Sequence, residues 1–231
     1  FRSIENFPEP GGCIIGNRPI DTHLRVMESL GASSVRKNGT YLFQASRLRG
    51  ASIILPEFSV TATENALMAA TLAEGTTVIK LAAAEPHVQD LVAFLKSMGA
   101  RIGGEGTHTL TIQGVESLRG ADHTLIPDQI EIGTFAVAAA ATRGSIEMMP
   151  VVPEHLDVIL LKLREAGAYC ELDGERLRVR SGGGLKAFRL QAMPYPGFPT
   201  DLQAPFGVLA TQCSGATLIH DPLFEGRMSY V

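Results

Sequence analysis

Apolar residues recur along the chain in a helical pattern that appears three times. In the middle of the chain the pattern consists of Val88, Leu91, Val92, Leu95 and Met98. This spacing of i, i+3, i+4 and i+7 predicts one apolar stripe along an amphipathic helix. The same pattern lies 68 residues upstream and 68 residues downstream, at Ile20, His23, Leu24, Met27 and Leu30 and at Leu156, Ile159, Leu160, Leu163 and Ala166.

A Gly-Ala pair follows each of these stripes. The pairs are Gly31-Ala32, Gly99-Ala100 and Gly167-Ala168, again 68 residues apart. Because glycine adopts the left-handed backbone conformation at little cost, each pair predicts the end of a helix. A proline, which the first turn of a helix tolerates, stands near each predicted start, at positions 19, 86 and 153.

A second set of elements follows each predicted helix in the same order. A short strand-like run comes first, then a helix rich in small apolar residues, then a glycine (Gly75, Gly144, Gly215) and a closing strand. We therefore predict an α/β fold built from one strand–helix–strand–helix–strand module, written three times. The strand runs are 41–43, 110–112 and 177–179, the small-residue helices are 65–72, 135–141 and 206–211, and the closing strands are 76–79, 145–148 and 216–219.

The composition predicts an ordinary globular protein that works in water. The 231 residues are 45% hydrophobic and 19% charged, with a net charge of −4 and a mean hydropathy of +0.13. A chain of this size accommodates two modest domains. The sequence has no run of 18 apolar residues and no basic-apolar leader, so we expect neither membrane insertion nor secretion. Scattered Lys and Arg under a net negative charge argue against nucleic acid as a partner.

The three cysteines and the two ends of the chain lead to two further expectations. Cys13, Cys170 and Cys213 lie far apart, without a CxxC spacing. This predicts neither a disulfide framework nor a metal site, and a cytoplasmic location fits best. The chain begins at Phe1 rather than methionine and ends at Val231 without a polar tail, so we expect both ends to be cut from a longer protein.

Chemistry is expected where one copy carries something that the other copies lack, and residues 11–19 are the first such place. They read Gly-Gly-Cys-Ile-Ile-Gly-Asn-Arg-Pro. Cys13, flanked by glycines and followed by Arg18, lies in surroundings that favour thiolate or proton-donor chemistry. The alternative is a loop with an incidental thiol. No Lys-Ser or Lys-Thr follows the glycines, so the segment is not a nucleotide phosphate loop of that kind.

The second place is His23, which occupies the position of Leu91 and Ile159 in the other copies. One interpretation is a buried histidine whose hydrogen bonds are satisfied. The other is a role in substrate binding, since His23 lies about one turn after Arg18.

The third and fourth places lie near the end of the chain. Residues 194–201 read Pro-Tyr-Pro-Gly-Phe-Pro-Thr-Asp, and the prolines and glycine predict a stiff bend that brings Asp201 to a helix start. Asp201 is then either a helix N-cap or, if Thr200 is the cap, a positioned base. Arg227, after the third closing strand, is either a surface ion-pair partner or a ligand for an anion.

At these residues the chain resembles the UDP-N-acetylglucosamine 1-carboxyvinyltransferase family of enolpyruvyl transferases. The cysteine loop distinguishes this family from its sister family of the shikimate pathway. The segments that carry the resemblance follow the family's order and cover nearly all of the chain: GGCIIGNRPID, SVTATENALMAATLAEGTTVI, AEPHVQDLVAFLKSMGARI, PDQIEIGTFAVAAAAT, PYPGFPTDLQ and LFEGR.

The resemblance implies an inside-out α/β barrel-like fold of six βαβαββ units in two domains, with the active site between them. Three of the six units are present here. Residues 1–126 are expected to form part of the first domain, with two units. Residues 127–231 are expected to form part of the second domain, with one unit and the start of the next. Residues that the family needs near its two ends lie outside this chain, so the fragment alone is expected to be inactive.

The resemblance also implies transfer of the enolpyruvyl group of phosphoenolpyruvate to the 3-hydroxyl of UDP-N-acetylglucosamine, the first committed step of peptidoglycan synthesis. No cofactor or metal is implied. By this resemblance Cys13 is the general acid and the target of fosfomycin, and Asp201 is the base or positions the hydroxyl. The substrate-binding residues that it implies are Arg18, Pro19, Ile20, Asp21 and Thr22 at the uridine end, Ser59, Val60 and Leu223 through the backbone, and Asp201 and Arg227.

Four residues depart from the family pattern. Glu57 stands where a lysine or an apolar residue is common, Thr61 replaces a glycine, Gln129 an arginine and Gly226 an asparagine. These departures bear on nucleotide affinity and leave Cys13 unchanged. Besides the enzyme, two other hypotheses for the function stay open. One is a non-catalytic relative that binds nucleotide sugars, and the other is a purely structural repeat module.

Overall fold

The computed structural model describes residues 3–8, 20–224 and 226–231, and the described part of the chain divides into two compact units. The division falls between Leu125 and Ile126, one residue before the predicted boundary. Each unit has its own hydrophobic core. The assignment of the two units to the two domains of the family stays a prediction.

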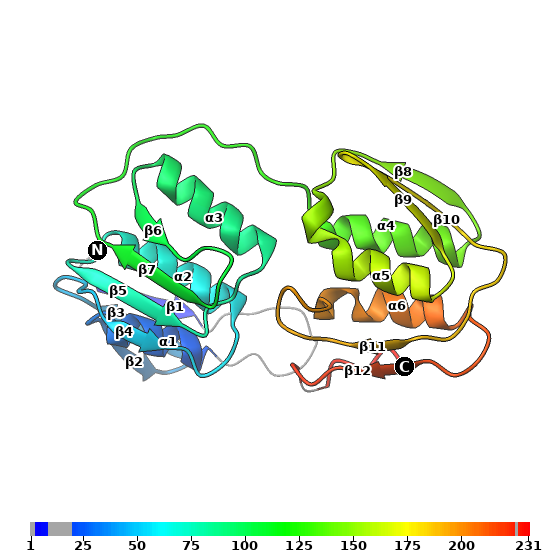
Figure 1. Ribbon diagram of the computed structural model, residues 1–231. Helices are drawn as coiled ribbons and strands as arrows, with labels where there is room; N and C mark the ends of the chain where they lie inside the picture. The colour runs from blue at the N-terminus through cyan, green and yellow to red at the C-terminus, as the bar shows by residue number, and fades with distance from the viewer. Residues whose placement is uncertain (1–2, 9–19, 225) are drawn as a thin grey trace. The chain divides into compact units, whose positions relative to one another are not determined.

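The first unit contains two sheets and three helices (Figure 1). One sheet has the strand order β1-β3-β2, and the other has the order β4-β5-β7-β6, with β4 and β5 parallel. In chain order the elements are β1 (Ser3–Pro8), α1 (Asp21–Ser29), β2 (Ser33–Lys37), β3 (Thr40–Gln44), β4 (Ser52–Ile54), α2 (Val60–Thr71), β5 (Thr76–Lys80), α3 (Pro86–Ser97), β6 (Arg101–Gly103) and β7 (Thr109–Gln113).

The second unit also contains two sheets and three helices. Its sheets have the orders β8-β10-β9, which is antiparallel, and β11-β12, which is parallel. The elements are α4 (Gln129–Ala141), β8 (Ser145–Met148), a 3-10 turn (Pro153–His155), α5 (Asp157–Glu165), β9 (Tyr169–Asp173), β10 (Arg176–Arg180), β11 (Arg189–Gln191), a second 3-10 turn (Thr200–Leu202), α6 (Gln203–Ala210) and β12 (Leu218–His220).

The same antiparallel arrangement occurs three times. β3, β7 and β10 are each the central strand of such an arrangement, between β1 and β2, β5 and β6, and β8 and β9 respectively. Residues 52–113 contain a complete βαβαββ unit, and the parallel pair β11-β12 repeats the β4-β5 pairing. The predicted α/β fold class and its repetition are confirmed.

The Gly-Ala pairs end α1, α3 and α5 as the sequence predicts. Gly31, Gly99 and Gly167 have φ angles of +94°, +105° and +96°. In every copy the alanine N–H donates to the carbonyl five residues earlier and the glycine N–H to the carbonyl three residues earlier, over 2.9–3.0 Å. This pair of bonds is the Schellman motif, which satisfies the last carbonyls of a helix while turning the chain.

The predicted stripe is enclosed completely in α5 and only in part in α1. Leu156, Ile159, Leu160, Leu163 and Ala166 are all buried. In α1 the most enclosed positions are instead Thr22, Val26 and Leu30, whereas Ile20, His23, Leu24 and Met27 are partly buried. α1 packs against α2, β2 and β4, and the enclosed residues Thr22, Val26 and Leu30 are spaced four apart, so they lie on one face of the helix.

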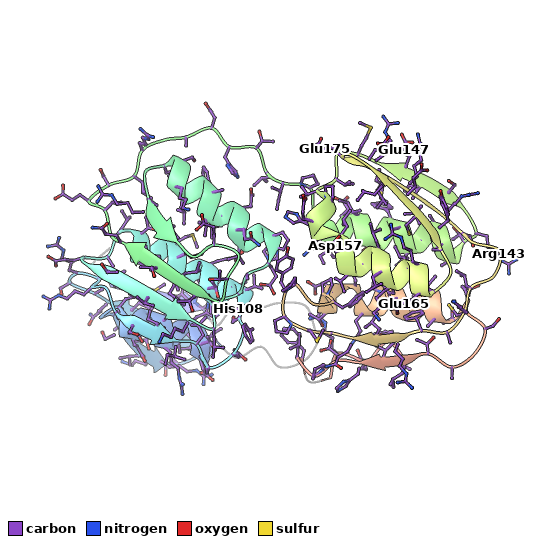
Figure 2. All side chains as sticks on the ribbon, viewed as in Figure 1. His108, Arg143, Glu147, Asp157, Glu165 and Glu175 are labelled. Atoms are coloured by element: carbon purple, nitrogen blue, oxygen red, sulfur yellow. The ribbon has the colours of Figure 1, made fainter. Side chains whose placement is uncertain are left out.

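The helix that precedes β8 ends differently from the prediction. Gly75 and Gly215 take left-handed φ angles of +95° and +101°, but after α4 it is Arg143 that does so, with φ +59°. Arg143 is labelled in Figure 2. α4 runs to Ala141, so Arg143 comes directly after the helix cap at Thr142. Gly144 follows it and donates to the carbonyl of Ala139 over 2.8 Å. The left-handed position of this turn therefore falls on a residue that is not glycine.

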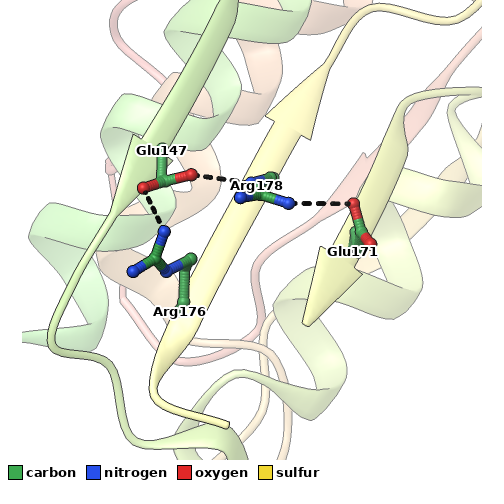
Figure 3. A network of polar contacts seen from close by, with 4 residues as sticks. All are labelled: Glu147, Glu171, Arg176 and Arg178. Carbon is green, nitrogen blue, oxygen red and sulfur yellow. Dashed lines mark hydrogen bonds and ion pairs between the residues drawn. The ribbon is translucent and has the colours of Figure 1, made fainter. Parts of the chain in front are cut away.

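The outward face of the β8-β10-β9 sheet carries a ladder of ion pairs. Glu147 accepts hydrogen bonds from Arg176 at 2.9 Å and from Arg178 at 2.6 Å, and Arg178 also lies 3.9 Å from Glu171 (Figure 3). The bond from Arg178 lowers the pKa of Glu147. The alternate residues of β10, such as Leu177, are buried in the core, which is the alternation expected of a half-covered sheet. No helix in the described part of the chain is long and apolar enough to cross a membrane.

Candidate functional site

The residues predicted to bind and convert substrates fall into three groups. Cys13, Arg18 and Pro19 lie outside the described residues. Ile20, Asp21, Thr22, Ser59 and Val60 lie at two helix starts in the first unit, and Asp201, Leu223 and Arg227 lie close together in sequence or space in the second unit. The structure describes the surroundings of the second and third groups.

In the first unit, Ser59 begins α2. Its side chain accepts a hydrogen bond from the N–H of Ala62 over 3.3 Å, so Ser59 is the N-cap. The carbonyl of Ser59 accepts from the buried hydroxyl of Thr63 at 2.7 Å, and that hydroxyl in turn accepts from the N–H of Ala83 at 2.9 Å. The first turn of α2 is therefore fixed by bonds both within the helix and to the segment after β5.

The residue before Ser59 is also anchored. The ring of Phe58 meets His108 edge to face, with the ring centroids 4.9 Å apart. His108 is itself held by a 2.9 Å contact between its Nδ1 and the carbonyl of Ala82. Such an aromatic contact contributes about 0.5–1.5 kcal/mol beyond the area that it buries.

The start of α1 lies beside the start of α2. The buried hydroxyl of Thr22 donates to Glu57 over 2.8 Å. The next residue, His23, contacts Thr61 through Nε2 at 3.2 Å and Asn65 through Nδ1 at 2.8 Å. Two of the four departures from the family pattern, Glu57 and Thr61, are thus partners of α1.

His23 itself is half-buried, and both of its ring nitrogens have partners. Burial lowers the pKa of His23, and the nearby charge of Glu57 offsets part of that effect. These contacts agree with the interpretation of a satisfied histidine. They also place it between the two helix starts that are predicted to bind the nucleotide sugar.

In the second unit, the segment before Asp201 is a stiff loop with an apolar anchor. Phe198 is 1% exposed and packs edge to face on Phe206 with ring centroids 4.9 Å apart. The loop is closed by the N–H of Gly197, which donates to Pro194 over 2.8 Å, and by the N–H of Met193, which donates to Phe198 over 3.0 Å. The bend that the sequence predicts here is therefore anchored to the hydrophobic core of the unit through Phe198.

Asp201 follows this loop in the 3-10 turn and forms an ion pair with Arg227. The Arg227 side chain is 16% exposed and the Asp201 side chain 59% exposed, so the carboxylate remains open to solvent while its partner is enclosed. The guanidinium of Arg227 also lies 5.0 Å above the ring of Phe224. No side-chain cap bond is found at α6, so neither Asp201 nor Thr200 acts as its N-cap.

Asp221 organises this site, and the sequence analysis did not find it. Its carboxylate accepts from the hydroxyl of Thr200 and, over 3.0 Å and 2.9 Å, from the amide of Gln203 and the N–H of Leu223. Asp221 therefore joins the segment that carries Asp201 to the segment that carries Leu223. The only signal in the sequence is an aspartate before a proline just after a strand, which is common in turns.

The other two departures lie at backbone features. Gly226 has φ +70°, a region that asparagine also enters more readily than other residues. Its replacement of the family's asparagine therefore keeps the local conformation accessible. Gln129 is buried in the first turn of α4, next to the N-cap Asp128, which accepts from the N–H of Ile130 at 2.7 Å.

Comparison with known proteins places these features in a family. A profile described as EPSP synthase (3-phosphoshikimate 1-carboxyvinyltransferase) matches residues 7–231. The chain belongs to the EPSP synthase family. Within it, the chain is 47% identical over 224 residues to UDP-N-acetylglucosamine 1-carboxyvinyltransferase 3 of Caldanaerobacter subterraneus, covering 97% of this chain and 54% of the relative. It is 48% identical over 228 residues to UDP-N-acetylglucosamine 1-carboxyvinyltransferase 2 of Prochlorococcus marinus, covering 97% of this chain and 53% of the relative.

Two proteins with solved structures share the fold. NikO, an enolpyruvyl transferase from Streptomyces tendae, matches with a TM-score of 0.79 at 24% identity, over 94% of this chain and 54% of that chain. EPSP synthase from Acinetobacter baumannii matches with a TM-score of 0.59 at 20% identity, over 90% of this chain and 50% of that chain. The chain thus spans about half the length of the curated relatives that it matches. The predicted resemblance and enolpyruvyl transferase fold are confirmed.

The loop before Asp201 gives the first testable prediction. A Cβ at Gly197 would lie 2.5 Å from Cβ of Met193 and 2.8 Å from the carbonyl oxygen of Pro194. We expect Gly197→Ala to lower the free energy of unfolding by about 1–3 kcal/mol, the usual effect of overpacking, as measured by urea denaturation. Gly183→Ala is the matched control, because a Cβ there meets no atom within 4 Å. Equal stability of the two variants would contradict the tight turn.

Proposed function

We propose that the protein containing this chain transfers the enolpyruvyl group of phosphoenolpyruvate to the 3-hydroxyl of UDP-N-acetylglucosamine and releases phosphate. The observation that carries the proposal is the identity of 47–48% with proteins named UDP-N-acetylglucosamine 1-carboxyvinyltransferase, over 97% of this chain. The proposal includes a cytoplasmic location and a role in the first committed step of peptidoglycan synthesis.

The reaction requires an acid and a base on opposite partners. In the addition step the sugar hydroxyl loses its proton to Asp201, its oxygen bonds to C2 of phosphoenolpyruvate, and C3 takes a proton from Cys13. In the elimination step the Cys13 thiolate takes a proton back from C3, the double bond re-forms, and phosphate leaves C2 with the electron pair of the broken bond and the proton that Asp201 had accepted. The exposed carboxylate of Asp201, held by the enclosed Arg227, suits a base that must be both reachable and fixed in direction.

The other cysteines support Cys13 as the reactive thiol. Burial raises the pKa of Cys170 to about 11, and burial also raises the pKa of Cys213. Both thiols therefore stay protonated at neutral pH and are poor nucleophiles. Cys13 is the cysteine of the chain that glycines and a nearby arginine surround in sequence.

Binding of the nucleotide sugar is assigned to the first unit. The starts of α1 and α2 present backbone N–H groups and the positive end of the helix dipole, which favour phosphate groups. Ile20 provides no side-chain cap to α1. Arg18 is proposed to add a cation there. In the second unit Leu223 is proposed to contact the sugar through its backbone, while Arg227 orients Asp201.

Fosfomycin labelling tests the role of Cys13. We define the extended chain as this sequence joined to the flanking segments of the Caldanaerobacter relative at both ends. Fosfomycin, an epoxide that mimics phosphoenolpyruvate, is expected to alkylate Cys13 of the extended chain when UDP-N-acetylglucosamine is present, as detected by peptide mass spectrometry. Cys170 is expected to stay unmodified, and Cys13→Ser to abolish the adduct. Finding no adduct on Cys13 would refute the assignment.

Substitution of the base gives a kinetic test. In the extended chain, Asp201→Asn is expected to lower kcat by about 10²- to 10⁴-fold, the usual contribution of a general base, in a phosphate-release assay. Asp173→Asn removes an exposed carboxylate on β9 of the same unit and serves as the control. A kcat for Asp201→Asn equal to that of the control would exclude Asp201 as the base. Binding of UDP-N-acetylglucosamine without phosphate release in the unsubstituted protein would favour the non-catalytic relative.

The length of the chain gives a third test. We expect the 231-residue chain to release little or no phosphate under conditions in which the extended chain turns over. The physical reason is that positioned cations stabilise the charge of the transition state, and the family resemblance puts some of these cations outside this chain. Equal rates for the two proteins would show that the shorter chain carries a complete site.

A further inference from the structure

Two consecutive residues of α1 hold the segment around Ser59 on both sides. Thr22 donates to Glu57, two residues before Ser59, and His23 contacts Thr61, two residues after it. His23 also contacts Asn65, which is one helical turn beyond Thr61 and therefore on the same face of α2. Side chains of α1 therefore form hydrogen bonds on both sides of Ser59, in addition to the packing of α1 against α2.

Of these contacts, those of His23 are specific to the first copy of the repeat. The equivalent positions carry Leu91 and Ile159, which lie in the apolar packing of their own copies. An apolar residue at position 23 would pack against α2 but would leave the side chains of Thr61 and Asn65 without this partner. The two hydrogen bonds of a histidine here restrict both the distance and the rotation between the starts of α1 and α2. Apolar packing, which is not directional, restricts this geometry less.

The contacts of His23 also determine the state of its ring. The amide nitrogen of Asn65 faces Nδ1, so Nδ1 is an acceptor, and Nε2 carries the proton and donates to Thr61. A protonated ring would present two donors, so Asn65 would have to turn its amide and offer the carbonyl oxygen to keep the bond. Burial lowers the pKa of His23 below its usual value of 6.5, so the neutral ring prevails at pH 7.

Charged residues lie on α1, on its neighbours α2 and β2, and in the segment before α2. Glu57, in the segment before α2, is the group whose charge acts on His23, and it raises the pKa in part. β4 carries no charged residue, and the carboxyl of Glu64 on α2 interacts instead with His87 and Glu85. The remaining charged residues on α1 and on the adjoining β2 are Asp21, Arg25, Glu28, Arg36 and Lys37.

We propose that His23, in its neutral form, is a positioning residue that sets the affinity for the nucleotide sugar by holding the starts of α1 and α2 in register through Thr61 and Asn65. This inference rests on the proposed function. His23 acts through the helix starts and takes no part in proton transfer to either substrate. Its loss therefore weakens nucleotide-sugar binding and leaves the chemical step intact.

The test measures the Kd for UDP-N-acetylglucosamine by titration calorimetry and the kinetic constants, using the extended chain. His23→Leu, which installs the residue of the second copy, is expected to raise Kd and the KM for the sugar about tenfold, in line with the loss of one part-buried and one exposed hydrogen bond. The value of kcat is expected to stay within about twofold, and the KM for phosphoenolpyruvate is expected not to change. Thr61→Val, which keeps shape and removes one partner, is expected to raise Kd about threefold.

The pH dependence gives an independent readout. Because the neutral ring is the binding form and its pKa is lowered, affinity is expected to be full above pH 6.5 and to fall as the pH drops below that value. His23→Gln keeps a donor and an acceptor but does not titrate, so its Kd is expected to be nearly independent of pH over this range. His87→Gln is the matched control on α3, an exposed histidine of the same unit, and is expected to follow the unsubstituted protein.

The outcomes separate this proposal from the one on which it rests. Failure of the unsubstituted extended chain to bind the sugar would overturn the proposed function and the role of His23 with it. Normal binding by that protein, with the same Kd and the same pH profile in Thr61→Val and His23→Gln, would overturn the role of His23 alone. These two variants keep a polar or equally sized side chain, so they decide the question even if His23→Leu fails to fold.

Discussion

Each repeat depends on a glycine that holds the left-handed conformation where its first helix ends. The alanine after it closes the last turn by donating to a carbonyl inside the helix, and the chain leaves in the direction of the next strand. For a residue with a Cβ, the left-handed conformation costs free energy. The position at which the helix stops is therefore determined by the glycine as well as by packing. Because the stop is fixed, the strand that follows each helix (β2, β6 and β9) pairs antiparallel with the central strand of its sheet in all three copies.

On this common scaffold the two functional clusters are held by different physical means. In the first unit, polar side chains of α1 reach across to the start of α2, and the pairs lie 35 to 42 residues apart in sequence. In the second unit, Phe198 anchors the loop before Asp201 in the apolar core, and Asp221 joins that loop to the residues around Leu223. The first cluster therefore depends on hydrogen bonds, and the second on the burial of Phe198 together with the hydrogen bonds of Asp221.

Periodicity was enough to predict the helices of the described residues, the ends of the first helices and the strands β3, β5, β7, β8, β10 and β12. The shorter or more polar strands β1, β2, β4, β6, β9 and β11 were not predicted. Periodicity was also not enough to predict which face of α1 is enclosed, since that depends on two neighbours that are distant in sequence. The partners of Glu57 and the role of Asp221 were missed for the same reason: a lone acidic residue in a turn does not show which donors the fold brings to it. The left-handed conformation of Arg143 was missed because it follows from the residue at which α4 ends. The sequence pattern did not predict that residue, and it pointed to Gly144 instead.

The separation of the two hydrophobic cores has a consequence for how the protein is made. One core draws its buried residues from positions 26–112 and the other from positions 132–209, with no residue in common. Closing each core needs only contacts within one continuous stretch of chain, which keeps the entropy of loop closure low. All the core residues of the first unit are synthesised before those of the second unit. The two units can therefore fold one after the other during synthesis.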